Sequence, residues 1–230
     1  VLGDFSNYYS TMSFEGEAQI VRELGKFLID KSLYQGFKPV LWSTVEKTAL
    51  ADAEVEYKDH TSNTIYVAFK IKDTKKDFLK EASIIIWTTT PWTIPGNRAL
   101  AFGKDLKYSL IEVQNVSDKS LVKVGDKLIF AEELVKTVTE EIGITDSKIL
   151  KTFDGENFTD CICEHPFKNV GYDFDVKPFH GDFVNLEQGT GIVHIAPGHG
   201  DDDYNLGIKN GVEIIQTVQD DGRYNQHAKG

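Results

Sequence analysis

The sequence has only two cysteines, Cys161 and Cys163, in 230 residues, which excludes a small disulfide-rich scaffold. One residue between them is too short for the C-x2-C spacing of a metal site and unsuited to a relaxed disulfide. Two reduced thiols, as in a cytoplasmic protein, are therefore expected. No apolar run approaches the roughly 18 residues that span a bilayer, and residues 1–4 lack the features of a secretion signal. We expect a soluble protein that does not bind membranes.

Basic residues are also scarce, because 25 Lys and Arg stand against 36 Asp and Glu and give a formal net charge of −11. Affinity for a nucleic-acid backbone comes from clusters of cations, so a protein that grips nucleic acid unaided is not expected. A domain that receives only the end of an RNA strand is compatible with this charge. The motifs G-x-S-x-G and H-E-x-x-H are missing too, which argues against covalent catalysis and against a metal hydrolase.

The residues that are present favour one ordinary globular domain. Apolar residues make up 40% of the sequence and aromatic residues 11%, as in soluble globular proteins. A chain of this length suits one large core, so we interpret residues 1–230 as a single domain. Because the chain begins without Met, we further interpret it as a piece of a longer polypeptide.

Hydrophobic periodicity predicts a helix that begins after Ser13, its expected N-cap, and stops before Gly36. A second helix is predicted over 131–142, and the three acids at 201–203 are typical of the start of a third. Apolar alternation predicts a strand over 64–71. Further short strands are expected over 83–88, 98–102, 107–113, 128–130, 148–153, 192–196 and 212–217. This pattern predicts a strand-rich α/β fold of barrel-like form.

A first segment with chemical potential, residues 87–98, follows the apolar run 84–86. Its candidate residues are Trp87, Thr88, Thr89, Thr90, Trp92, Thr93 and Asn97. Hydroxyls, indoles and an amide at one strand end suit hydrogen-bonding to a sugar while water is excluded. The structural alternative is equally open from the residues alone, because threonines favour strands and tryptophans fill cores.

A second segment, residues 189–204, contains His194 within a short apolar strand, then His199 and the three acids. A lone histidine in such a strand is more often a core residue than a ligand. The two histidines and the acids would also suit a metal cluster, but no metal motif supports one. Helix capping explains Asp201 and Asp202. One of the three acids is expected to turn inward and bind a cation such as an ammonium group.

Together the two segments resemble the editing domain inserted into the class I synthetases for isoleucine, valine and leucine. Pro91 and His194 are similar to the isoleucine form, because the leucine and valine enzymes typically carry Arg at the first position and the valine enzymes Lys at the second. The resemblance covers essentially the whole chain, including residues 1–4, 48–57 and 220–224. It implies a barrel-like editing domain with peripheral helices, which residues 1–45 and 212–230 connect to a catalytic domain absent from this chain. Ser43 and Glu46 stand where some bacterial members have a Cys pair, so no structural zinc is expected.

The resemblance implies a hydrolase that removes valine from tRNA(Ile), and it leaves open hydrolysis of valyl-adenylate. The partners would be the 3′ end of that tRNA and the rest of the synthetase, with the fragment itself a monomer. No cofactor is expected, since ATP and Mg would belong to the absent catalytic domain. Two alternatives remain: a valine-type domain that clears threonine, and a non-catalytic RNA-binding insert.

The resemblance also implies a role for each candidate residue. His194 would form a wall of the pocket, and Asp203 would hold the α-ammonium group of the amino acid. Thr88, Thr89, Thr90 and Asn97 would position the adenosine, the ester and the water. Trp87, Trp92 and Thr93 would complete the walls, and His199 would also bind the substrate. One methylene changes binding in an apolar pocket by only about 1–3 kcal/mol, for which isoleucyl-tRNA synthetase is itself the standard example. A second, smaller pocket would therefore admit valine and refuse isoleucine.

Overall fold

The computed structural model describes residues 3–229, so residues 1 and 2 of the resemblance lie outside the described residues. The chain divides into two units, Val1–Phe37 and Lys38–Gly230. The first unit contains helix α1 (Phe14–Ile29), and the Ser13 hydroxyl accepts a hydrogen bond from Gly16 N at 3.3 Å, as expected of its N-cap. The helix ends well before Gly36, contrary to the prediction, because Lys31 adopts a φ of 67° that interrupts the right-handed helix.

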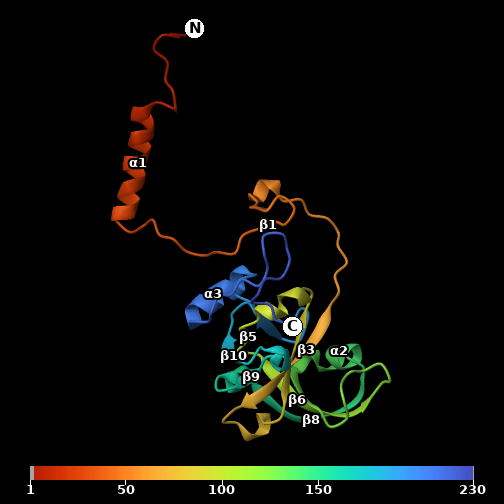
Figure 1. Ribbon diagram of the computed structural model, residues 1–230. Coiled ribbons are helices and arrows are strands. Elements are labelled where there is room, and N and C mark those ends of the chain that lie inside the picture. The colour runs from red at the N-terminus through yellow and green to blue at the C-terminus, as the bar shows by residue number, and fades with distance from the viewer. Residues whose placement is uncertain (1–2, 230) are drawn as a thin grey trace. The chain divides into compact units, whose positions relative to one another are not determined.

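The second unit is built around one nine-stranded mixed sheet of order β11-β5-β10-β9-β3-β4-β7-β6-β8 (Figure 1). Its strands are β3 (Ile65–Asp73), β4 (Ser83–Thr88), β5 (Ala99–Phe102), β6 (Lys107–Val116), β7 (Lys127–Ala131), β8 (Ile144–Asp154), β9 (Ile162–Glu164), β10 (Asp175–His180) and β11 (Ile192–Ile195). A separate hairpin pairs β1 (Trp42–Ser43) with β2 (Thr48–Ala49). The helices are α2 (Val135–Glu141) and α3 (Asp201–Asn210). Short 3-10 turns are η1 (Asp52–Glu54), η2 (Asp77–Leu79), η3 (Pro91–Gly96), η4 (Glu132–Leu134), η5 (Gly155–Phe158) and η6 (Lys168–Val170).

The predicted α/β class is confirmed, and the sheet is open where a barrel-like form was expected. Strand pairing is parallel between β5 and β10 and between β4 and β7, and it is antiparallel elsewhere. Within residues 3–229 no pairing joins the two end strands, β11 and β8. In that part of the chain no helix is long and apolar enough to cross a membrane.

Most predicted strands are confirmed, but the strand predicted over 212–217 is wrong. That segment has no ladder, and the nearest pairing is an isolated bridge between Val218 and Tyr224. Its apolar side chains are half-buried although the backbone pairs with no strand. The apolar pattern of this segment therefore indicated burial, and not strand pairing. The helix predicted over 131–142 is divided into η4 and α2. Strands β9 and β10 were not predicted, and Pro178 inside β10 is a residue that argues against an interior strand.

The short strand β5 brings the two candidate segments together. It follows η3 directly, all four of its residues are buried, and it pairs antiparallel with β11 in a register that sets Leu100 opposite His194. Arg98 N also donates to Ile195 O at 2.8 Å. Residues about 100 positions apart in the sequence are therefore neighbours at one end of the sheet.

Candidate functional site

A chain of hydroxyl contacts runs along the threonine-rich segment. The hydroxyl oxygens of Thr88 and Thr90 lie 3.2 Å apart, and those of Thr90 and Thr93 lie 3.4 Å apart. The Thr93 hydroxyl donates to Thr90 O at 2.8 Å and lies 3.1 Å from His194 Nε2. The pattern places three of the candidate threonines in one network with the candidate histidine.

The contact with Thr93 defines the protonation of His194. Since the Thr93 hydroxyl proton is used on Thr90 O, its oxygen accepts the hydrogen bond and His194 Nε2–H donates it. Burial lowers the pKa of His194 to about 4, with smaller contributions from His199 and His165. The ring is therefore neutral at pH 7, and its buried Nδ1 is an acceptor that has no hydrogen-bond partner within residues 3–229.

His199 and Trp92 form a second part of the same site. Their rings meet edge to face with centroids 5.3 Å apart, and His199 Nε2 lies 3.1 Å from the hydroxyl oxygen of the buried Thr217. Gly96 makes this approach possible, because a Cβ there would lie 3.0 Å from His199 Cδ2. Burial lowers the pKa of His199 as well. The two histidines beside η3, His194 and His199, are thus both disfavoured as cations by burial.

Asp203 supplies a carboxylate beside this neutral surface. It lies in the first turn of α3, and its Oδ2 accepts a hydrogen bond from Ala196 N at 2.8 Å, two residues after His194. Burial raises the pKa of Asp203 to about 6, against the smaller lowering effect of that hydrogen bond. No ion pair in the described part of the chain includes Asp203. Asp201 and Asp202 are exposed, as expected of acids at a helix start.

Three other candidate residues lie outside the hydrogen-bond network of the threonines and His194. The Thr89 side chain is exposed, and Trp87 is half-buried and lies against Gly189. Asn97 is fully buried and donates to Ala99 O at 2.8 Å. Its amide oxygen has no hydrogen-bond partner within residues 3–229. Asn97 Oδ1 and His194 Nδ1 are therefore two buried acceptors without a partner among the described residues.

Two residues near the site were missed by the sequence analysis. Thr217 contacts His199, and His165 contacts the carbonyl of Ile94 in η3, with Nε2 and the oxygen 3.0 Å apart. His165 comes just after a strand that was not predicted, and its partner is 71 positions away. The only local signal was a histidine between Glu164 and Pro166, which specifies no partner.

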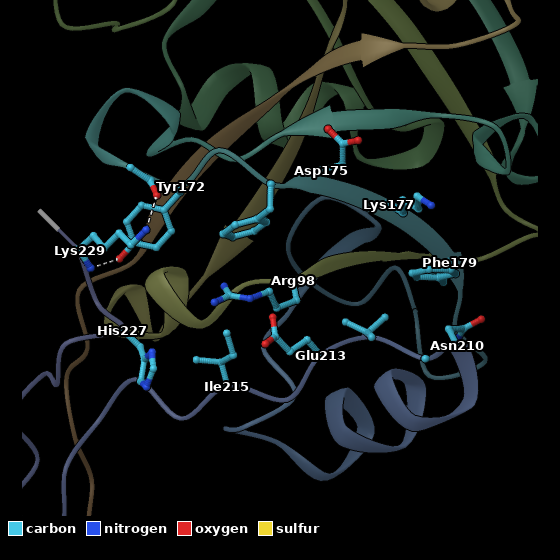
Figure 2. Close-up of a pocket in the computed structure, with 14 residues that line it drawn as sticks. Arg98, Tyr172, Asp175, Lys177, Phe179, Asn210, Glu213, Ile215, His227 and Lys229 are labelled. Carbon is cyan, nitrogen blue, oxygen red and sulfur yellow. Dashed lines mark hydrogen bonds between the residues drawn. The ribbon is translucent and has the colours of Figure 1, made fainter.

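A cavity of about 470 Å³ that was not predicted lies beside Arg98, Phe174, Glu213, Asn210 and Lys229. Figure 2 shows Arg98 and Glu213 extending toward its interior. The Arg98 guanidinium lies 4.3 Å from the centroid of the Phe174 ring, and its Nη1 donates to Pro95 O at 3.2 Å and Asn97 O at 2.6 Å. The lining contains none of the candidate threonines, His194 or Asp203, so this cavity is separate from the candidate site.

The residues considered for a metal site are Ser43, Glu46, Cys161 and Cys163. Ser43 donates its hydroxyl to Glu46 at 2.5 Å, so these two residues contact each other at the positions of the family's cysteine pair. Cys161 and Cys163 are free and buried, and burial raises the pKa of both thiols, that of Cys161 to about 11. No cluster of three or more His, Cys, Asp or Glu side chains in residues 3–229 suits a metal ion.

Comparison with known proteins identifies the family. Residues 1–149 match the tRNA synthetases class I (I, L, M and V). The chain is 55% identical over 99% of its length to the isoleucine–tRNA ligase of Pelagibacter ubique and 50% identical over 97% to that of Gluconobacter oxydans. It spans about a quarter of the length of these relatives, 25% and 24%.

Similarity to solved structures is more distant. The editing domain of the Plasmodium knowlesi cytosolic leucyl-tRNA synthetase is 14% identical with a TM-score of 0.48, and the match covers 65% of this chain and 64% of that one. A crystal structure of GlLeuRS-CP1 is also 14% identical, with a TM-score of 0.47 over 65% of this chain and 66% of that one. The family match covers well over half of the sequence, and the chain therefore belongs to the class I tRNA synthetases.

Proposed function

We propose that this chain is the editing domain of an isoleucyl-tRNA synthetase and hydrolyses the ester of valyl-tRNA(Ile). Its similarity to isoleucine–tRNA ligases supports the amino-acid class. The observation that carries the proposal is the position of Asp203, a half-buried carboxylate without an ion-pair partner among the described residues, bonded to Ala196 close to His194. An aminoacyl ester brings an ammonium group of the opposite charge, which such a carboxylate binds strongly.

In the proposed reaction, Asp203 holds the α-ammonium group and the neutral His194 ring limits the size of the side chain. Hydrogen bonding to Thr93 fixes that ring, so the wall is rigid. Adding one methylene to a packed site costs about 1–3 kcal/mol, which disfavours isoleucine. The buried acceptors Asn97 Oδ1 and His194 Nδ1 are suited to ribose hydroxyls, an ammonium group or the water.

Hydrolysis adds water across the ester, so that the carbonyl carbon gains the water oxygen and the ribose hydroxyl leaves. An aminoacyl ester is already activated, and the reaction requires positioning and stabilisation of the oxyanion more than a strong base. The hydroxyls of Thr88, Thr89 and Thr90 are the proposed groups for this task. We propose no cofactor for the step.

The decisive experiment is deacylation of valyl-tRNA(Ile) and isoleucyl-tRNA(Ile), assayed side by side with this fragment. We expect loss of the valyl ester and survival of the isoleucyl ester. Threonyl-tRNA(Val) is the third substrate, because preferred hydrolysis of that ester would assign the domain to the valine type. Binding of tRNA without any hydrolysis would contradict the proposal in favour of an RNA-binding insert.

A further inference from the structure

The turn η3 carries Thr93, and three of its carbonyl groups contact side chains, two of which come from distant parts of the chain. Ile94 O lies 3.0 Å from His165 Nε2, Trp92 O accepts from the Tyr224 hydroxyl at 3.0 Å, and Pro95 O accepts from Arg98. Trp92 O has no partner within the turn, because Pro95 lacks an N–H. Ile94 O already accepts from Asn97 N at 3.0 Å, so the contact with His165 is its second hydrogen bond and links the turn to another part of the chain. Among the three donors, only His165 is fully buried.

The hydrogen bonds of His165 define one tautomer. Its Nδ1 accepts from Phe167 N at 3.1 Å and therefore carries no proton. In a neutral ring the proton is then on Nε2, which donates to Ile94 O. Burial lowers the pKa of His165 to about 4, so the neutral form persists at pH 7. One ring nitrogen therefore donates a hydrogen bond and the other accepts one.

The aromatic surroundings of His165 prevent its ring from turning. The ring stacks on Tyr172 with centroids 4.6 Å apart and planes at 13°, and Phe174 and Phe69 contact it at 5.2 and 6.2 Å. The side chain is 1% exposed. A hydrogen-bond donor fixed in this way sets the position of its acceptor, Ile94 O.

We propose that His165 is a positioning residue for the editing reaction: through its Nε2–H bond to Ile94 O it sets the place of η3, and so the contact of Thr93 with His194. This inference rests on the proposed function for its kinetic readout, and on the hydrogen-bond geometry for its structural one. His165 itself does not contact the reacting atoms. Misplacement of a reacting geometry by about 1 Å lowers a rate by about 100-fold.

The test compares two substitutions with opposite properties. His165→Phe keeps the aromatic stacking and loses both hydrogen bonds, whereas His165→Gln keeps an N–H donor near the position of Nε2. For valyl-tRNA(Ile) we expect His165→Phe to lower kcat by about 10- to 100-fold with KM changed less than about threefold, and His165→Gln to restore most of kcat. His180→Phe is the matched control, because the ring nitrogens of His180 face Lys104, Phe102 and Asp182, none of which belongs to η3.

Nitrogen-15 NMR of the imidazoles in the unmodified chain keeps the inference testable if His165→Phe fails to fold. We expect His165 protonated at Nε2 only, and we expect the His194 Nε2–H signal in His165→Gln to remain close to its position in the unmodified chain. A His165 protonated at Nδ1, or a folded His165→Phe variant with wild-type kcat, would overturn the inference. If the unmodified chain hydrolyses no aminoacyl-tRNA, the proposed function is wrong, and the NMR result alone decides whether His165 sets the position of η3.

Discussion

The hydroxyl oxygen of Thr93 and the Nε2 of His194 lie 3.1 Å apart, although 101 positions separate the two residues in the sequence. The contact joins the turn after β4 to the strand β11 through the pairing of β5 with β11. It also fixes the His194 ring in one orientation and one neutral tautomer. The proposed size filter is therefore a rigid, uncharged wall, which leads to the first prediction.

Replacing His194 by Ala is expected to remove the wall and let the isoleucyl ester be hydrolysed as well. The ratio of kcat/KM for isoleucyl-tRNA to that for valyl-tRNA should rise by about 10-fold or more, the usual discrimination for one methylene. Deacylation of both esters under identical conditions measures it. The control is His180→Ala, which alters a half-buried histidine of β10. If His194→Ala still spares isoleucyl-tRNA, His194 is not the size filter.

Replacing Asp203 by Asn is expected to lower kcat/KM for valyl-tRNA by about 10- to 100-fold, the value of a hydrogen bond between charged groups. The amide oxygen of Asn still accepts from Ala196 N, so only the charge is removed. Asp202→Asn is the matched control, since it removes one charge from the same first turn of α3 at an exposed position. Equal effects of the two substitutions would show that helix electrostatics, and not an ammonium contact, explain the loss.

The activity should depend on pH through Asp203. Burial raises the pKa of this carboxyl to about 6, and only the ionised form attracts an ammonium group. We expect kcat/KM for valyl-tRNA to be retained above pH 6 and to fall about tenfold per pH unit below it, since this parameter reports the free enzyme. A profile measured between pH 5 and 8 at constant ionic strength decides the point. A flat profile over that range would remove Asp203 from the binding step.

Asp203 should also lower the stability of the folded domain at neutral pH. Its pKa is raised from 3.8 to about 6 by burial, so folding favours the protonated form. This favourable contribution is complete below pH 3.8 and is lost as the pH rises through 6. The Asp203→Asn variant is therefore expected to be more stable than the wild type at pH 8, with a free energy of unfolding about 1–3 kcal/mol higher. Denaturant titrations at pH 8 and pH 4 test this, and a difference that grows at pH 4 would contradict it.

Gly191, at the start of β11, should tolerate no side chain. Its φ is +72°, and a Cβ there would lie 2.6 Å from Ala131 Cβ. We expect Gly191→Ala to lower the free energy of unfolding by about 2–4 kcal/mol through strain and overpacking. Gly125→Ala is the control, since Gly125 has a φ of +91° with nothing within 4 Å of its added Cβ, so it measures backbone strain alone. Equal losses in the two variants would contradict the packing argument.

The sequence predicted those parts of the fold that depend on neighbouring residues. The strand β4 was predicted with its observed bounds because Ile84, Ile85 and Ile86 form a continuous run of β-branched apolar residues. The Ser13 cap was equally local. The segment 212–217 failed because apolar side chains can be half-buried without strand pairing, a difference that hydrophobicity does not report. The open order of the sheet depends on long-range pairing and was not accessible from periodicity.

The candidate site was less accessible from local sequence patterns than the strands were. Residue chemistry alone left both segments undecided between a site and a core, and the resemblance selected the individual residues. The hydrogen bond between Thr93 and His194 depends on the register of β5 and β11, which no local pattern specifies. His165 was missed for the same reason, because its role exists only through Ile94. The assigned catalytic and binding roles of these residues remain predictions.

The strand β5 has only four residues, all of them buried, and it lies between β10 and β11 immediately after the turn that carries Thr93. Under the proposed function, selection between the two esters would therefore depend on residues deep in the interior as well as on residues at the surface of the pocket. A variant such as Leu100→Ala, opposite His194, would fold less stably and also discriminate less well. The packing of a hydrophobic core and the proposed selection between esters would thus depend on the same four residues.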